Sequence, residues 1–105
     1  RTGTLVRTPT AETIADGIAV REPVPEALAM LAGLWDDVVA VDDATLVRAM
    51  RGLAAHAGLV VEPAGAAGVA ALLDAPRGAF GARVATILCG GNVDPARLGD
   101  WIGGT

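Results

Sequence analysis

More than a third of this chain consists of residues that have little or no side chain. Ala and Gly together account for 36 of the 105 residues, and the only aromatic residues are Trp35, Phe80 and Trp101. Small side chains let backbones approach closely, but each one buries little apolar area. We therefore expect tightly packed elements around a thin core, suited to packing against more protein than these 105 residues.

The charged residues exclude several classes of function. The net charge is −4, all eight basic residues are Arg, and Lys is absent. Because no basic cluster is present, the pattern does not favour a nucleic-acid partner. Without a lysine amine, this chain alone cannot form a Schiff base with a carbonyl group.

The single cysteine, Cys89, cannot form an internal disulfide, which fits a reducing compartment. No apolar run reaches the roughly 18 residues of a membrane span, and the N-terminal residues lack the apolar stretch of a signal peptide. We therefore expect a cytoplasmic protein with no membrane partner. One Cys and one His, His56, are too few for a metal site, and none is expected.

Hydrophobic periodicity predicts helices that alternate with short buried strands. The predicted helices are 25–34, 45–58, 64–74 and 95–101, and the predicted strands are 38–41 and 84–89. Asp42 or Asp43 is suited to cap the second helix, Gly58 to end it, and Asp94 to cap the last. The alternation predicts a single α/β domain, with a partial parallel sheet and flanking helices.

The helix predicted over 64–74 is almost wholly apolar, which predicts burial on all its sides. Gly65 and Gly68 each weaken it by about 1 kcal/mol relative to Ala. We therefore expect a close neighbour along the face that carries these two glycines.

A Cys-Gly-Gly-Asn turn follows the predicted strand 84–89. Ligands bind beyond the carboxyl ends of strands in open α/β sheets, and glycine lets backbone N–H groups approach a ligand. The alternative is a glycine-rich turn that serves geometry alone. Cys89 could be a nucleophile, a ligand contact or a small buried core residue.

Two other titratable residues have a structural and a functional interpretation. Glu62 precedes Pro63 at a predicted helix start. There it could cap the helix or interact with the helix dipole, contributing about 0.3–1 kcal/mol, or it could line a pocket. His56 is expected to interact with the dipole at its helix end rather than to pair with Cys89. The Asp pairs at 36–37 and 42–43 are expected to be solvated ends and caps.

Three stretches together resemble one enzyme family: ETIADG at 12–17, EPAGAAGVAAL at 62–72 and ILCGGNVD at 87–94. In this order and spacing they are similar to the C-terminal part of the catalytic domain of threonine dehydratase and serine racemase-like enzymes. These enzymes belong to the fold-type-II, tryptophan-synthase-β-like, pyridoxal-phosphate family. The resemblance extends from about residue 9 to residue 102.

The resemblance implies a role for each matching residue. Cys89 would face the pyridine nitrogen of pyridoxal phosphate, at a position where the family usually has Ser. Glu62 would lie beside the ring. The segment Ala15, Asp16 and Gly17 would run past the cofactor and the substrate pocket, with the Gly17 backbone nearest the cofactor. The turn under the ring would be formed by Gly90, Gly91 and Asn92.

The resemblance also implies that parts of such an enzyme lie outside these residues. The family's cofactor-anchoring lysine, its glycine-rich phosphate loop and the divalent-cation site of its racemase-like members have no counterpart here. Residues 1–105 are therefore expected to be the C-terminal segment of a pyridoxal-phosphate-dependent catalytic domain, with no catalytic residue of its own. Its expected partners are the lysine-bearing part, or a second chain that carries it, and further copies in a homo-oligomer.

The implied activity is an ammonia-lyase reaction on threonine or serine, which gives a 2-oxo acid and ammonia. A serine racemase-like or another β-eliminating enzyme is the nearest alternative. The chain could also be a non-catalytic α/β module that binds a partner or a small anion, because it lacks Lys. Its apolar helices and thin core would also suit a piece whose role is assembly alone.

Overall fold

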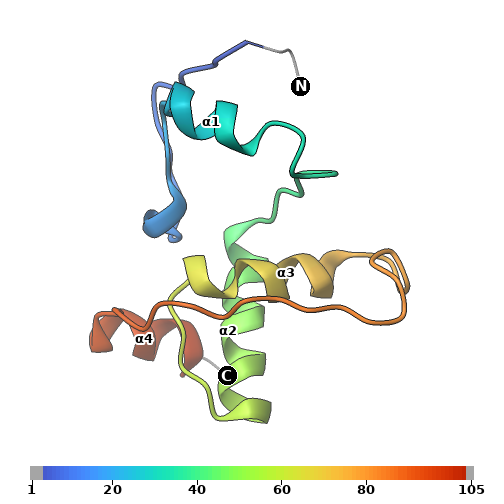
Figure 1. The fold of residues 1–105 in the computed structure, drawn as a ribbon. Coiled ribbons are helices and arrows are strands. Elements are labelled where there is room, and N and C mark those ends of the chain that lie inside the picture. Colours follow the sequence, from blue (N-terminus) through green and yellow to red (C-terminus); the bar gives the residue numbers. More distant parts are fainter. Residues whose placement is uncertain (1–3, 104–105) are drawn as a thin grey trace.

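The computed structural model describes residues 4–103, which form helices joined by long extended segments (Figure 1). Two short 3-10 helices and four α-helices follow one another in the order η1 (Asp16–Ile18), α1 (Pro25–Leu31), α2 (Asp43–Ala57), η2 (Ala64–Ala66), α3 (Ala67–Asp74) and α4 (Pro95–Ile102). None of these helices has the length and apolar character needed to cross a membrane.

The predicted α/β fold with a partial parallel sheet is wrong, because residues 4–103 contain no strand. Residues 38–41 and 84–89 are not helical, yet no backbone hydrogen bond joins one to the other within this described part. A strand exists only through hydrogen bonds to a neighbour, and an apolar run cannot supply these by itself. The predicted burial of these two segments is also wrong, since Val38 is 66% exposed and Ile87 is 81% exposed.

The central helix α2 begins and ends as its sequence predicts. At its start, the Asp42 carboxylate accepts a hydrogen bond of 2.7 Å from the Thr45 N–H. At its end, Gly58 adopts a φ of +64° and donates its N–H to the carbonyl of Leu53. Glycine takes this left-handed conformation at little cost, which is why it commonly terminates helices.

The cap of α2 predicts a pH-dependent stability. The hydrogen bonds from the backbone N–H and then the hydroxyl of Thr45 hold the pKa of Asp42 below its ordinary 3.8. A carboxyl whose pKa falls on folding stabilises the protein above its unfolded pKa and loses this contribution as pH falls through the folded value. We expect Asp42→Ala to lower the melting temperature at pH 7, and the difference from the parent chain to shrink below pH 3.8.

Thermal unfolding followed by circular dichroism at several pH values would measure this difference. Asp42→Asn is the matched control, because its amide oxygen can accept the same hydrogen bond without titrating. A difference in melting temperature between the parent chain and Asp42→Ala that stays constant down to pH 2 would contradict the prediction.

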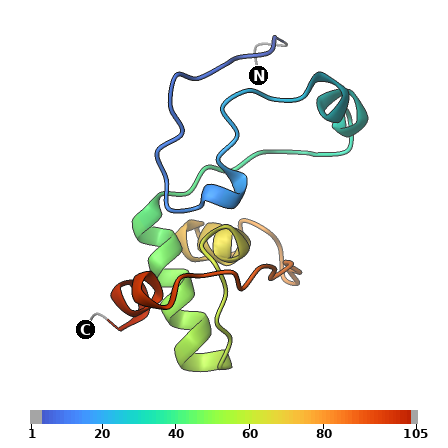
Figure 2. The ribbon, with the colours of Figure 1, turned by 90° about the vertical axis from the view of Figure 1, so that its left-hand side faces the viewer.

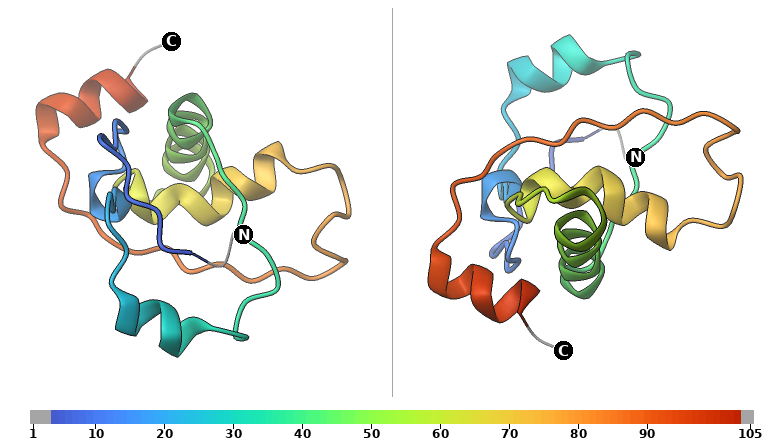
Figure 3. Two further views of the ribbon diagram at one scale, coloured as in Figure 1. Left: turned by 90° about the horizontal axis from the view of Figure 1, so that it is seen from above. Right: turned by 90° about the horizontal axis from the view of Figure 1, so that it is seen from below.

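The core lies where α2 crosses η2 and α3, with α4 on the other side of α2 (Figures 1 and 3). Its buried apolar members among the described residues are mostly small: Ala15, Leu46, Ala49, Met50, Val61, Ala66 and Ala70. Arg51 anchors α4 to α2 by donating from Nε to the carbonyl of Trp101, at 2.6 Å. The thin core that the composition predicts is therefore confirmed, and it is organised around α2.

The apolar helix predicted over 64–74 is present as η2 followed by α3, but it is not buried on all sides. Leu73 is 51% exposed, whereas Ala66 and Ala70 are fully buried. Only the face toward α2 and the segment after Thr86 is covered, because no further layer lies over the outer face within the described residues.

Helix α1 stands apart from this core, whereas η1 lies against η2 (Figure 2). Among the described residues, α1 packs against no other helix. It ends at Leu31 rather than at residue 34, and Gly33 follows with a φ of +77°. The segments on either side of η1 are tied together at Thr8, whose N–H donates to the carbonyl of Arg21 at 3.0 Å.

Candidate functional site

Three segments that are far apart in the sequence meet at Glu62, which is half-buried. Its N–H donates to the carbonyl of Gly90 at 3.1 Å. A Cβ built on Gly17 would lie 3.6 Å from Glu62 Oε1, and one built on Gly90 would lie 2.7 Å from Glu62 Cγ. The Glu62 side chain therefore occupies the space that Gly90 leaves open, and it lies in van der Waals reach of Gly17.

The same side chain lines a small cavity of about 40 Å³. Asp16 and Asn92, two more of the residues singled out in the sequence, line this cavity together with Glu62. The 3-10 helix η2 has no side-chain cap. Glu62 therefore does not cap η2 with its side chain, and it lies at the wall of a cavity.

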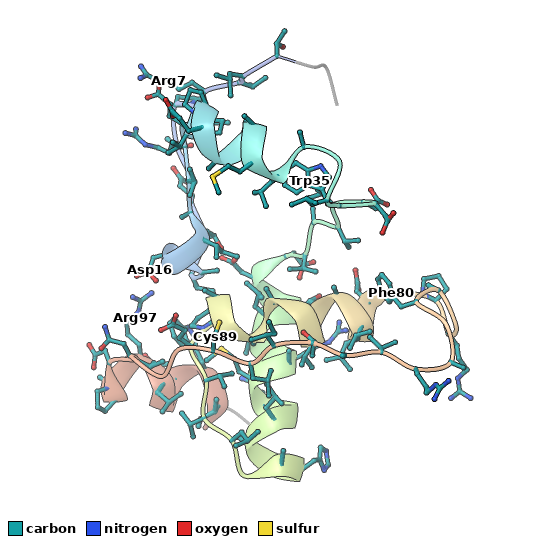
Figure 4. All side chains as sticks on the ribbon, viewed as in Figure 1. Arg7, Asp16, Trp35, Phe80, Cys89 and Arg97 are labelled. Carbon is teal, nitrogen blue, oxygen red and sulfur yellow. The ribbon has the colours of Figure 1, made fainter. Side chains whose placement is uncertain are left out.

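Arg97 also lines this cavity and was not found by sequence reasoning. Its guanidinium group lies over the Trp101 ring, 4.7 Å from the ring centroid. Figure 4 shows Arg97 rising from α4 on the same side of the molecule as Asp16. The signal in the sequence was the four-residue spacing of Arg97 and Trp101, which places the two side chains on one face of a helix.

The segment before η1 is held by Asp43. The Asp43 carboxylate accepts a hydrogen bond from Thr13 Oγ1 at 2.5 Å and one from the Ile14 N–H at 3.1 Å. Asp42 is thus the cap of α2, and Asp43 beside it has a further contact that its sequence context did not indicate. Ala15, which follows, is only 2% exposed and belongs to the core, whereas Asp16 is exposed at the cavity.

The predicted close neighbour of the glycine face is confirmed. A Cβ on Gly65 would overlap the carbonyl oxygen of Cys89, and one on Gly68 would lie 3.2 Å from the Cβ of Thr86. The segment 86–89 thus runs directly against η2 and α3, as Figure 1 shows beneath α3. This contact brings the Cys-Gly-Gly-Asn turn to Glu62.

Cys89 is exposed, so its interpretation as a buried core residue is wrong. Gly90 follows with a φ of +75°, and Gly91 is exposed. His56 lies in the last turn of α2, and no hydrogen bond joins it to Cys89 in the described part of the chain. The structure therefore presents an exposed thiol at the start of a glycine turn, without a histidine base.

A sequence model of a family described as pyridoxal-phosphate dependent enzymes matches residues 1–90. The chain belongs to this family. The resemblance seen in the three sequence stretches is thereby confirmed.

Three curated relatives show which enzymes this pyridoxal-phosphate family member is similar to. An L-threonine ammonia-lyase of Geobacter sulfurreducens is 36% identical over 92 residues, which cover 88% of this chain and 23% of that protein. An L-threo-3-hydroxyaspartate ammonia-lyase of Saccharomyces cerevisiae is 36% identical over 104 residues, which cover 99% and 32%. A serine racemase of Schizosaccharomyces pombe is 30% identical over 102 residues, which cover 97% and 32%. The chain spans about a quarter to a third of these relatives.

The residues at the turn fit part of what the family's cofactor, pyridoxal phosphate, requires. Cys89 offers an exposed thiol and Asn92 an amide, both neutral groups able to hydrogen-bond a ring nitrogen or oxygen. Gly90 and Gly91 leave the backbone uncovered beside them. The covalent anchor is not among these residues, because the chain contains no Lys.

Proposed function

We propose that this chain forms one wall of the cofactor and substrate site of a pyridoxal-phosphate-dependent ammonia-lyase. The proposed substrates are threonine and serine, from which the enzyme releases a 2-oxo acid and ammonia. The chain would be the C-terminal segment of the catalytic domain. The lysine that anchors the cofactor would come from the rest of the enzyme or from a second chain, and the assembly would be a homo-oligomer.

The convergence on Glu62 carries this proposal. Gly17, Glu62 and Gly90 come from three separate stretches, and these are the stretches through which the sequence resembles the family. The names of the relatives add support for the substrate class, since threonine, 3-hydroxyaspartate and serine all carry a hydroxyl group on the β-carbon.

Pyridoxal phosphate, when bound, supplies the electron sink that makes the α-proton of an amino acid removable and allows a β-hydroxyl group to leave. In the proposed site, the Cys89 thiol is the neutral partner of the ring nitrogen. Gly90 and Gly91 would leave the backbone free to approach the bound cofactor. Glu62 keeps the turn in place through its N–H, and the backbone at Asp16 and Gly17 borders the substrate.

A neutral thiol at the ring nitrogen has a chemical consequence. Unlike a carboxylate, it does not favour a protonated ring nitrogen, because it places no negative charge beside it. A ring nitrogen that stays largely unprotonated weakens the electron sink, which suits β-elimination better than transfer of the amino group. This supports a lyase rather than an aminotransferase.

A chimeric enzyme tests the proposal. In it, this chain replaces the 92 matching residues of the Geobacter sulfurreducens L-threonine ammonia-lyase. We expect the chimera to bind pyridoxal phosphate and to release a 2-oxo acid from L-threonine or L-serine, measured by coupled dehydrogenase assay. A chimera that binds the cofactor but releases no 2-oxo acid from either amino acid would show that the lyase proposal is wrong. If it also forms no D-serine, a non-catalytic binding module would be favoured.

Substitutions at Cys89 in the chimera test the ring contact. Cys89→Ser keeps a neutral hydrogen-bonding group, and we expect little change in the dissociation constant of the cofactor. Cys89→Ala removes the group, and the loss of one hydrogen bond weakens cofactor binding about 2- to 10-fold. Equal affinities of the Ala and Ser variants would contradict the assigned contact.

Racemisation is the second candidate, because the Schizosaccharomyces pombe serine racemase matches 97% of this chain. The same chimera distinguishes the two. Formation of D-serine from L-serine without 2-oxo acid, followed by chiral chromatography, would favour the racemase.

A further inference from the structure

At Gly65 the backbone of η2 lies directly against the backbone of the segment that carries Cys89. Gly65 itself is buried. A Cβ there would overlap the carbonyl oxygen of Cys89, and would lie 2.8 Å from its carbonyl carbon and 3.3 Å from its amide nitrogen. These are backbone atoms, which cannot rotate away as the end of a side chain can. Any side chain at Gly65 would therefore push the whole Cys89 peptide outward by more than an ångström.

We propose that Gly65 is a positioning residue for Cys89, whose thiol and following glycine turn are set in place by the contact between the two backbones. The geometric part of this inference stands on the described contacts alone. Its consequence for the cofactor rests on the proposed function, in which the Cys89 thiol faces the ring nitrogen.

Residues 89–90 are held by two different interactions from the turn formed by residues 62–66. Gly65 provides the steric contact, and Glu62, three residues earlier, donates its N–H to the carbonyl of Gly90 at 3.1 Å. The intervening turn is itself closed, because the Ala66 N–H donates to the carbonyl of Glu62 at 3.1 Å. Both contacts therefore come from one closed, largely buried turn.

Gly68 faces the same segment but does not have this role. A Cβ there would meet the side chain of Thr86 and none of its backbone atoms. A threonine side chain can change its rotamer, so the segment need not shift as a whole. This difference separates the positioning contact at Gly65 from ordinary helix packing at Gly68.

Hydrogen exchange measured by NMR on residues 1–105 tests the geometry without any cofactor. In Gly65→Ala, the displaced Cys89 peptide would pull the Gly90 carbonyl away from the Glu62 N–H. We expect exchange of the Glu62 amide to become about tenfold faster, the effect of losing one hydrogen bond, while amides in the middle of α2 such as Met50 keep their protection.

Gly52→Ala is the matched control, because Gly52 is also helical and a Cβ there meets nothing within 4 Å. We expect it to leave the Glu62 amide unchanged. An unchanged Glu62 amide in Gly65→Ala would overturn the inference.

The unsubstituted chain provides a second test, which holds even if Gly65→Ala does not fold. The contact predicts nuclear Overhauser effects between the α-protons of Gly65 and the amide protons of Cys89 and Gly90. Their absence from the spectrum of the folded chain would overturn the inference in the same way.

The chimeric enzyme tests the consequence for the cofactor. We expect Gly65→Ala to weaken pyridoxal-phosphate binding, and to weaken it no further once Cys89→Ala is present, since both would act through the same thiol. Additive losses in the double variant would show that Gly65 does not act through Cys89. If Cys89→Ala alone does not change the affinity for pyridoxal phosphate, the ring contact of the proposed function is wrong. The positioning role of Gly65 is tested separately, by the exchange rate of the Glu62 amide.

Discussion

Leu46→Ala is expected to destabilise the chain by about 2–5 kcal/mol. Leu46 is 2% exposed and is one of the few large side chains in the core. Replacing it leaves a cavity between α2 and its neighbours, and the surrounding alanines have no long side chains that could move in to fill the space. Small domains are stable by only about 5–15 kcal/mol, so this single change would remove a large share of the total.

Urea unfolding followed by circular dichroism would measure the loss. Leu34→Ala is the matched control, because the same atoms are removed at a site that is 76% exposed. We expect that control to stay within about 0.5 kcal/mol of the parent chain. Equal effects of the two substitutions would mean that α2 is not the centre of the core.

Gly90→Ala is expected to cost at least about 2 kcal/mol, through two separate effects. The φ of +75° penalises any residue with a Cβ by about 1–2 kcal/mol. The new methyl group would also overlap the carboxyl group of Glu62 and force that side chain out of its place at the cavity. Unfolding free energies from urea titration would give the sum of both effects.

Gly58→Ala separates these two effects. Gly58 has a φ of +64°, and a Cβ there meets nothing within 4 Å, so its substitution carries the backbone penalty alone. The extra cost at Gly90 should disappear in a Glu62→Ala background, where the overlap is gone. If Gly90→Ala costs no more than Gly58→Ala in the parent chain, Glu62 does not occupy the space beside Gly90.

The sequence was sufficient for the features that depend on local interactions. The start and end of α2 follow from Asp42 and Gly58, and the start of α4 follows from Asp94, whose carboxylate accepts a hydrogen bond of 2.9 Å from the Ala96 N–H. Each of these signals acts within a few residues of its own position, so no knowledge of the rest of the fold is needed.

The lack of a sheet in residues 4–103 could not be foreseen from the sequence, because strand formation depends on a partner segment. Residues 38–41 and 84–89 have the composition of buried strands, but this composition does not show whether another segment lies at hydrogen-bonding distance. In the structure described over 4–103 they stay extended without a ladder. The same limit applies to Asp43, whose partners at Thr13 and Ile14 lie about thirty residues away.

The sequence indicated several residues of the candidate site, but it did not show how they are arranged in space. Gly17, Glu62 and Gly90 were chosen through a family resemblance, and the structure brings them together. The cavity also contains Arg97, which the resemblance did not indicate. The positions of Gly65 and Gly68 did suggest a close neighbour, but only coordinates could show that the neighbour is the Cys89 peptide.

The exposure of Cys89 has a practical consequence, because it is the only sulfhydryl group in the chain. Labelling studies usually need a protein with one reactive cysteine and obtain it by mutating the other cysteines. This chain already has a single cysteine. A thiol-reactive fluorophore or a nitroxide spin label would attach at one atom beside the glycine turn. The rate of that attachment can be measured while a vitamin B6 derivative is titrated in. A slower rate would report that the derivative covers the glycine turn, without the need for a catalytic assay.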